Sequence, residues 1–176
     1  MATSQKTNHS QVLSESTEKA IQAFEGLGTD DKLALLYYIY EKMGDSITPA
    51  APTATDPEIA PSLLGDFFEL SDEKQLAVMR EIVNCEETEL SRAYGGLTPN
   101  NQLVVWYAWA KGMGDTVVDL PSDYKATKAV KDALSLIEGF EFEEQISVLR
   151  QAASDMGYSE VGEVPSQKET GKTSSL

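Results

Sequence analysis

The sequence predicts an all-α protein built from two related helical halves. Three observations predict this class: apolar residues recur at helical spacing between capping residues, no stretch alternates apolar and polar residues between hairpin turns, and the chain aligns with itself at an offset of about seventy residues. With 176 residues, the chain can bury a sizeable core as one domain or as two small packed halves.

The first clear helix is predicted over residues 30–43, and the second after Ser71. Thr29 offers an N-cap followed by two aspartates in the first turn, and we expect Gly44 to end this helix. Ser71 caps the second helix in the same way. The apolar stripes are Leu33, Leu36, Tyr37 and Tyr40 in the first helix, and Leu76, Met79 and Val83 in the second.

Two more clear helices follow Thr98 and Glu141. Thr98 precedes a proline at the first helical position, and we expect this helix to run to Gly114; Gly157 can end the other. Their stripes are Leu103, Trp106, Tyr107, Ala110 and Met113 in one, and Phe142, Ile146, Leu149 and Ala153 in the other. Weaker helical signals cover residues 16–25, 57–70, 87–94 and 124–138.

The internal repeat is carried by specific motifs. The stretch "LLYYIYEKMGDSI" at residues 35–47 meets "VWYAWAKGMGDTV" at 105–117, and the same register reaches a shared Gln-x-x-Val-x-Arg at 75–80 and 145–150. Two shared polar motifs at one offset are hard to obtain by chance. We infer two helical halves of about seventy residues each, packed with pseudo-twofold symmetry.

Segments of low apolar content mark the expected boundaries. We predict a polar N-terminal arm over residues 1–15, a helical domain over 16–158 and a disordered polar tail over 159–176. Residues 46–57, rich in proline, alanine and threonine, should form a surface connector.

Charge and composition exclude several function classes. Twenty-nine acidic and fourteen basic residues give a formal net charge of −15, which disfavours nucleic acid and anionic lipid surfaces as partners. The start "MATSQKTNHSQ" lacks the features of a signal peptide, and no run of eighteen apolar residues occurs. We therefore expect a soluble cytosolic protein without membrane insertion, and a monomer.

Patterns for catalysis and metal binding do not occur in the sequence. His9 lies in the polar arm, and Cys85 has no histidine partner, so we expect a solvated histidine and a buried or half-buried thiol. The acidic clusters at 86–87 and 141–144 match no calcium loop, and Gly95-Gly96 forms no phosphate loop. We expect neither an enzyme nor a metal site.

The aromatic stripes allow two interpretations. Tyr37, Tyr40, Trp106 and Tyr107 can form plain hydrophobic core, or they can wall a ligand, because buried tyrosine and tryptophan need polar partners that leucine does not. A globule of this size is about 40 Å across. A C40 polyene, about 30 Å long like the hydrocarbon core of a bilayer, would nearly span it.

Several motifs together resemble the helical carotenoid proteins, relatives of the N-terminal domain of cyanobacterial orange carotenoid protein. They are "DDKLALLYYIYEKMG" from residue 30 to 44, "AAP" at 50–52, "TPNNQLVVWY" at 98–107, "LPSDYK" at 120–125, and "QISVLR" at 145–150 followed by "DMGY" up to residue 158. The resemblance runs from about residue 24 to 158, and the pieces occur in order at nearly constant spacing.

This resemblance implies two interleaved four-helix bundles with a keto-carotenoid (canthaxanthin, echinenone or 3'-hydroxyechinenone) in a tunnel between them. Arg150 matches an arginine with which the orange protein docks its other domain and the phycobilisome, although an arginine near a helix C-terminus also complements the helix dipole. The positions that match pigment contacts are Leu33, Leu36, Tyr37, Tyr40, Met79, Leu103, Trp106, Tyr107, Ala110, Met113, Leu120 and Tyr124.

The sequence also departs from the orange protein. Tyr37 and Leu97 stand where it has tryptophan, and Ala110 stands where it has glycine, so ring stacking and tunnel width should differ there. The chain ends after the helical domain, whereas the orange protein continues into an α+β domain. We therefore expect no light switch.

The resemblance implies two functions, and a third interpretation involves no pigment. The first is photoprotection by constitutive quenching of singlet oxygen through the pigment. The alternative is a phycobilisome-docking quencher of antenna excitation, and a pigment-free helical scaffold is the third. The implied partners are the carotenoid, a carrier protein like the C-terminal domain, and the phycobilisome; the implied location is cytoplasmic, with proximity to thylakoid membranes left open.

Overall fold

A computed structural model describes residues 14–47 and 60–159. These residues form α1 (Glu15–Glu25), α2 (Thr29–Ile47), α3 (Pro61–Leu64), the 3-10 helix η5 (Asp66–Glu69), α4 (Asp72–Val83), α5 (Glu89–Gly95), α6 (Pro99–Gly112), α7 (Lys128–Glu138) and α8 (Phe142–Ser154). Within them, the only strand-like pairing is an isolated bridge between Met113 and Val117. The predicted all-α class is confirmed.

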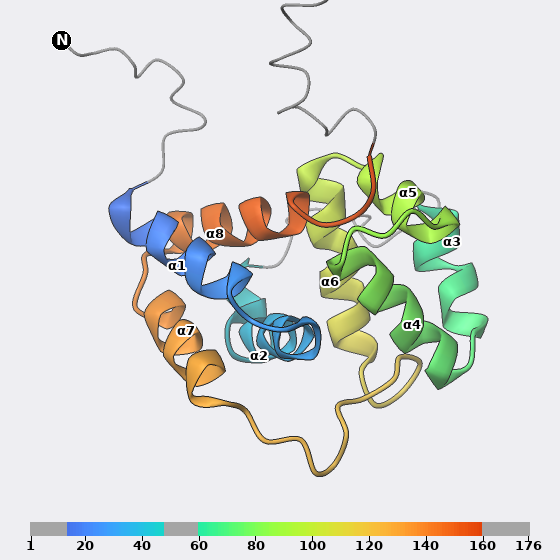
Figure 1. Cartoon of the computed structure of the whole chain (residues 1–176), viewed down its shortest axis with the longest axis horizontal. Coiled ribbons are helices and arrows are strands. Elements are labelled where there is room, and N and C mark those ends of the chain that lie inside the picture. The colour runs from blue at the N-terminus through green and yellow to red at the C-terminus, as the bar shows by residue number, and fades with distance from the viewer. Residues whose placement is uncertain (1–13, 48–59, 160–176) are drawn as a thin grey trace, which may run out of the picture.

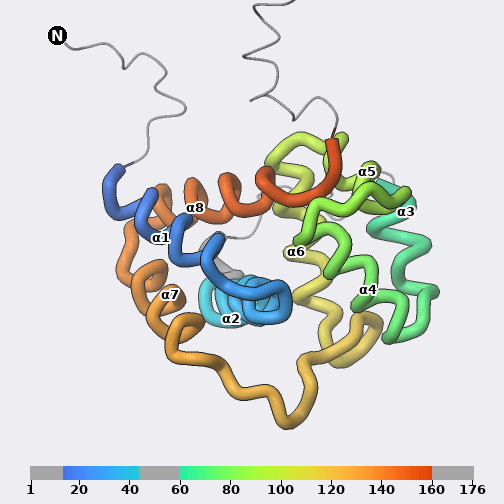
Figure 2. Tube along the Cα trace, in the orientation of Figure 1, coloured from blue at the N-terminus to red at the C-terminus, as the bar shows by residue number. Residues whose placement is uncertain are grey.

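The helices form two bundles that are interleaved along the chain. In Figure 1, α1, α2, α7 and α8 lie together on the left, and α3, α4, α5 and α6 on the right. An offset of seventy aligns α1 with α5, α2 with α6, α3 and η5 with α7, and α4 with α8. Each bundle therefore takes helices from both halves of the sequence, and the chain path in Figure 2 leaves the left bundle after α2 and returns to it before α7. The predicted interleaved bundles are confirmed.

Packing follows the same pseudo-twofold relation. The contact of α2 with α4 corresponds to that of α6 with α8, and α2 meets α6 where the two halves join. Two buried glutamines repeat one hydrogen bond: Nε2 of Gln75 donates to the carbonyl of Phe67 at 3.2 Å, and Nε2 of Gln145 to that of Ile137 at 3.1 Å. The helix order and these equivalent contacts agree with the inferred duplication.

Side-chain caps set the starts of most helices. Ser14, Ser71, Thr88, Thr98 and Thr127 each adopt extended backbone and accept a hydrogen bond from the amide three residues later. Each cap satisfies one of the amides that a helix start leaves unpaired. Glu141, at the start of α8, makes no such bond.

The predicted ends of α2 and α6 are wrong. Helix α2 continues past Gly44 to Ile47, and α6 stops at Gly112, two residues before Gly114. Gly114 has φ of +83°, and its amide donates to the Val117 carbonyl at 2.9 Å. This turn uses a conformation that glycine adopts readily. The same Met-Gly-Asp motif is thus helical in one half and forms a turn in the other.

Two weaker predicted helices also differ from the structure. In place of one helix over 57–70, the described part of this range contains α3 and η5, separated by Gly65 with φ of −131°. Helix α7 begins at Lys128 and not at residue 124, because the Thr127 side chain caps it by accepting from the Val130 amide. Tyr124 therefore lies on the loop that crosses between the bundles at the bottom of Figure 1.

The segment after α8 closes the fold against α4 and α5. Helix α8 ends at Ser154, and Gly157, which was expected to end it, follows with φ of +82°. The Gly157 amide donates to the Ile82 carbonyl at 2.8 Å, and that of Tyr158 to the Ser91 carbonyl at 3.0 Å. A Cβ on Gly157 would lie 2.5 Å from the Tyr94 ring, so glycine permits this close approach.

Several predictions lie mostly outside the described residues. These are the arm over 1–15 with His9, the connector over 46–57 and the tail over 159–176, and the domain boundaries stay predictions. None of the described helices combines the length and apolar content that crossing a membrane requires.

Candidate functional site

A cavity of about 330 Å³ lies at the seam between the bundles. Its walls come from α2, α4, α6 and the loop before α7, and most of the side chains that line it are apolar or aromatic. They are Asp30, Leu33, Leu36, Tyr37, Tyr40, Leu76, Met79, Arg80, Trp106, Trp109, Ala110, Met113, Val118, Asp119, Leu120, Pro121 and Tyr124.

Helix α2 gives the cavity its length. Its lining residues recur three or four positions apart, so they share one face of the helix. Between Asp30 and Tyr40 the helix rises by about 15 Å, at 1.5 Å per residue. This is roughly half the length of a C40 polyene, taken as about 30 Å.

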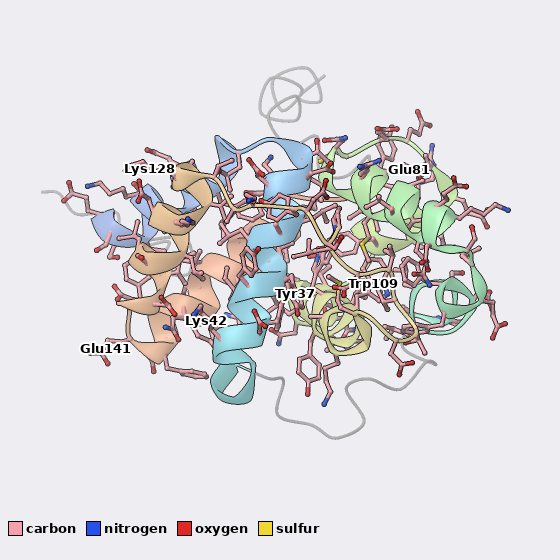
Figure 3. The ribbon with its side chains drawn as sticks, turned by 90° about the horizontal axis from the view of Figure 1, so that it is seen from below. Tyr37, Lys42, Glu81, Trp109, Lys128 and Glu141 are labelled. Atoms are coloured by element: carbon pink, nitrogen blue, oxygen red, sulfur yellow. The ribbon has the colours of Figure 1, made fainter. Side chains whose placement is uncertain are left out.

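Two tryptophans of α6 also line the cavity. The rings of Trp106 and Trp109 meet edge to face with centroids 5.1 Å apart, and Trp109 stacks on Phe67 at 4.2 Å. Nε1 of Trp109 donates to the Leu63 carbonyl at 3.0 Å, and Nε1 of Trp106 to the Tyr94 hydroxyl at 2.8 Å. These bonds fix the indoles and satisfy their only donors. Figure 3 shows Trp109 and Tyr37 beside the seam.

The tyrosines of the cavity are held neutral. Burial raises the pKa of Tyr40, whose hydroxyl donates to the Leu103 carbonyl at 3.2 Å. Burial, followed by the hydrogen bond to Asp31 at 2.8 Å, raises the pKa of Tyr124. Burial and the nearby carboxylates of Glu41 and Asp119 raise the pKa of Tyr37. At neutral pH these walls carry no tyrosinate charge.

The buried Gln75 attaches the loop that covers the cavity. Its Nε2 donates to the Thr116 carbonyl at 2.9 Å, and its Oε1 accepts from the Val118 amide at 2.8 Å. Val118, Asp119, Leu120 and Pro121 then line the cavity directly. One side chain of α4 therefore positions the loop, which the sequence pattern alone did not indicate.

Ten of the twelve residues predicted to contact a pigment line this cavity. Leu103 and Tyr107 do not. Leu103 is buried, and its carbonyl accepts from Tyr40; the ring of Tyr107 packs beside that of Tyr40 with Lys111 5.6 Å from its centroid. The helix turns by about 100° per residue, so Trp106 and its neighbour Tyr107 face different sides.

Sequence reasoning missed several lining residues, of which Trp109 is the largest. Trp109 stands three positions after Trp106, a spacing that would have predicted it. Asp30 and Arg80 were not expected to line the cavity, because a stripe search for apolar residues leaves out charged ones.

Arg150 lies away from the cavity on exposed surface. Its Nε donates to Oδ1 of Asn100 at 3.1 Å. At the equivalent place in the first half, Nε and Nη2 of Arg80 donate to the two carboxylate oxygens of Asp30, both at 2.9 Å. The duplicated arginine is thus paired with a carboxylate in one half and with a neutral amide in the other.

A second cavity of about 270 Å³ contains Cys85 and Asp155. Cys85 was expected to be buried or half-buried, but it is exposed. It follows α4 with φ of +57°, and its thiol donates to the Asp155 carbonyl at 3.2 Å. Burial and a hydrogen bond with Glu25 raise the pKa of Asp155 to about 6. Among the described residues, no three or more histidine, cysteine, aspartate or glutamate side chains cluster in a way that could hold a metal ion.

The fold and the cavity define a helical protein with interleaved bundles and an apolar cavity at their seam. The chain belongs to the family described as "Orange carotenoid protein, N-terminal", whose sequence model matches residues 10–159.

Known relatives agree with this membership. An orange carotenoid-binding domain-containing protein from Nostoc sp. is 41% identical over 138 residues, which cover 78% of this chain and 81% of the relative. The orange carotenoid-binding protein of Synechocystis sp. is 33% identical over 139 residues, again 78% of this chain but only 44% of the relative.

Solved structures share the fold. The red carotenoid protein of Anabaena (Nostoc) sp., solved binding canthaxanthin, has a TM-score of 0.71 at 34% identity and covers 82% of this chain and 99% of that one. The orange carotenoid protein of the same organism, also binding canthaxanthin, has a TM-score of 0.75 at 28% identity over 84% of this chain and 47% of that one.

Proposed function

We propose that this protein holds a keto-carotenoid in the seam cavity and quenches singlet oxygen through it, independently of light. The observation that carries the proposal is the apolar cavity at the seam, lined by Trp106 and Trp109 of α6 and by residues of α2. Flat aromatic walls and a mostly apolar lining suit a rigid polyene. The relatives that bind canthaxanthin support the assignment.

The residues of the chain would bind, orient and shield the pigment. A bound carotenoid supplies a low triplet state that accepts energy from singlet oxygen and sheds it as heat. Trp106 and Trp109 offer polarisable surface, and the neutral tyrosines add contact without charge. The ten predicted residues that line the cavity are the proposed contacts. Canthaxanthin, echinenone and 3'-hydroxyechinenone are the candidate pigments, and a cytoplasmic location is part of the proposal.

Expression in a carotenoid-producing host tests the binding. We expect a coloured protein from which solvent extracts a keto-carotenoid, and faster decay of singlet-oxygen phosphorescence with the coloured protein than with the colourless one. A colourless product from a host rich in canthaxanthin would favour the pigment-free scaffold and refute the proposal.

Independence of light is proposed because the cavity walls belong to one packed helical unit. Helices α2, α4 and α6, which carry most of the lining, contact each other directly or through the core. Light can shift a protein between states only where it biases a two-state element. We expect equal quenching in darkness and after blue-green illumination; a reversible red shift of the isolated coloured protein would contradict this.

A second candidate function, docking on the phycobilisome to quench antenna excitation, has one supporting observation. Arg150 is exposed, and its only hydrogen bond among the described residues goes to the neutral Asn100. The net charge of −15 opposes docking on an acidic antenna. Addition of the coloured protein to phycobilisomes should leave their fluorescence unchanged; quenching that Arg150→Gln abolishes would establish this second function.

A further inference from the structure

One end of the seam cavity is polar because of Arg80 and Asp30. Asp30 is the lining residue nearest the start of α2, and Arg80 is the one nearest the end of α4. Since the two side chains are hydrogen-bonded to each other at 2.9 Å, they mark the same end of the cavity. Arg80 is the only cation among the lining residues.

The other polar donors of the cavity are mostly committed to the protein. The indoles of Trp106 and Trp109 donate to Tyr94 and to Leu63, and the hydroxyls of Tyr40 and Tyr124 donate to Leu103 and to Asp31. Of the tyrosine and tryptophan donors that line the cavity, only the Tyr37 hydroxyl has no hydrogen-bond partner among the described residues. The carboxylates of Glu41 and Asp119 lie near it. A ligand oxygen that only accepts hydrogen bonds therefore finds few donors along the walls.

The Arg80 guanidinium has N–H groups that its pairing with Asp30 does not use. A guanidinium carries five N–H groups, and the pair with Asp30 uses one on Nε and one on Nη2. Three N–H groups remain. The side chains of Arg80 and Asp30 are 46% and 58% exposed, and their bidentate pairing favours one plane of the guanidinium in the absence of a ligand.

We propose that Arg80, oriented by Asp30, donates a hydrogen bond to the ring keto oxygen of the bound carotenoid and so selects keto-carotenoids over carotenoids without ring oxygen. This inference rests on the proposed function of the cavity. A keto oxygen only accepts hydrogen bonds, so the carboxylate of Asp30 would repel it, and the guanidinium supplies the matching donor. Echinenone, with one keto ring, should bind with that ring at Arg80.

The pseudo-twofold relation provides a matched control. Arg150 is the equivalent residue at an offset of seventy and makes the same kind of hydrogen bond through Nε, but it does not line the cavity. Arg150→Met removes an exposed arginine from an equivalent helix position and leaves the cavity end unchanged.

Competition between two pigments tests the proposal. Colourless protein is mixed with equal amounts of canthaxanthin and β-carotene in detergent micelles, and the bound pigments are extracted and quantified. We expect the wild-type protein and Arg150→Met to favour canthaxanthin roughly tenfold, which corresponds to about 1.4 kcal/mol. Arg80→Met should reduce the ratio to near one by weakening canthaxanthin alone, and Arg80→Lys should restore part of it.

The outcomes separate the inference from the function on which it rests. If the wild-type protein retains neither pigment, the proposed function fails. If it retains both, but equally, or if Arg80→Met keeps the preference, the role of Arg80 is refuted while carotenoid binding stands. A preference that only Tyr37→Phe removes would assign the contact to Tyr37 and also refute it.

An infrared measurement covers the case in which Arg80→Met does not fold. In the wild-type protein, one carbonyl stretch of bound canthaxanthin should lie below its position in an aprotic solvent, because a hydrogen bond weakens the C=O bond. Two carbonyl bands at the aprotic position would overturn the proposal without any variant.

Discussion

The two halves of this protein differ in conformation even where they share a sequence motif. Met43-Gly44-Asp45 lies inside α2, whereas Met113-Gly114-Asp115 follows α6 and includes the turn at Gly114. The turn is held by Gln75 of the first half, which bonds to Thr116 and Val118. The same Met-Gly-Asp sequence thus adopts two conformations, because the second copy leads into the loop that covers the cavity.

The two halves also contribute different kinds of residue to the cavity. The first half contributes the long wall of α2 and the charged pair Asp30 and Arg80, and the second contributes the tryptophans and the covering loop. A duplicated fold therefore carries an asymmetric site. Substitutions that make one half resemble the other should show how much each difference contributes.

The largest effect is expected for Trp106→Leu, which gives the second half the residue found at Leu36. Trp106 is buried, lines the cavity and donates to Tyr94 at 2.8 Å. Loss of the indole should destabilise the protein by about 2–4 kcal/mol and shift the visible absorption of a bound pigment. Urea unfolding and absorption spectra measure both effects. Leu36→Met, which conserves volume, is the control and should cost less than about 1.5 kcal/mol.

The next largest effect on stability and pigment retention is expected for Gln75→Leu, compared with the equivalent substitution Gln145→Leu. Gln75→Leu removes three hydrogen bonds, including the two that hold the loop, and should cost about 1–3 kcal/mol with loss of pigment retention. Gln145→Leu removes the one described side-chain hydrogen bond of Gln145, to Ile137, and should cost about 1 kcal/mol with retention unchanged. Equal effects of the two substitutions on retention would show that the loop does not depend on Gln75.

Alanine substitution of the two glycines of the shared motif should change stability in opposite directions. Gly114→Ala forces alanine to φ of +83°, with its Cβ 3.3 Å from Asp119, and should destabilise by about 1–2 kcal/mol. Gly44→Ala replaces glycine inside a helix and should stabilise by up to about 1 kcal/mol. Thermal unfolding of both variants checks this. A loss of stability in Gly44→Ala would contradict the expected opposite signs.

The smallest effect concerns Asp155, which aligns with Cys85 at the ends of α8 and α4. Burial and Glu25 raise its pKa to about 6, so the folded state binds a proton more tightly than the unfolded state does. Its contribution to stability is therefore present below about pH 4 and is lost as the pH rises through 6. Lys32 and Gln151 partly oppose the shift.

Asp155→Asn mimics the protonated carboxyl. It should flatten the dependence of unfolding free energy on pH between 4 and 6, and raise stability at pH 7 by about 1 kcal/mol after screening by solvent. Urea unfolding at several pH values measures this, with Asp115→Asn, at an exposed position, as control. A variant as pH-dependent as the wild type would refute the assignment of this pH dependence to Asp155.

Much of the fold could be predicted because its signals are local. Caps such as Ser71 and Thr98 and apolar stripes three or four residues apart predict helices from neighbours in the chain. The predicted end at Gly114 failed where a distant partner, Gln75, holds the following loop, whereas the start of α7 was misplaced because the local cap at Thr127 was overlooked. Ten of twelve expected lining residues share the cavity because a helical stripe presents one face.

By itself, the sequence determined the helical class, the duplication and the apolar stripes, since each depends on spacing along one element or on similarity between two. The tertiary structure decided which stripe residues face the cavity, how Gln75 holds the covering loop, and that Arg80 meets Asp30 while Arg150 meets Asn100. These outcomes depend on hydrogen bonds between residues about forty to fifty positions apart, and such contacts form only when packing of the bundles brings the helices together.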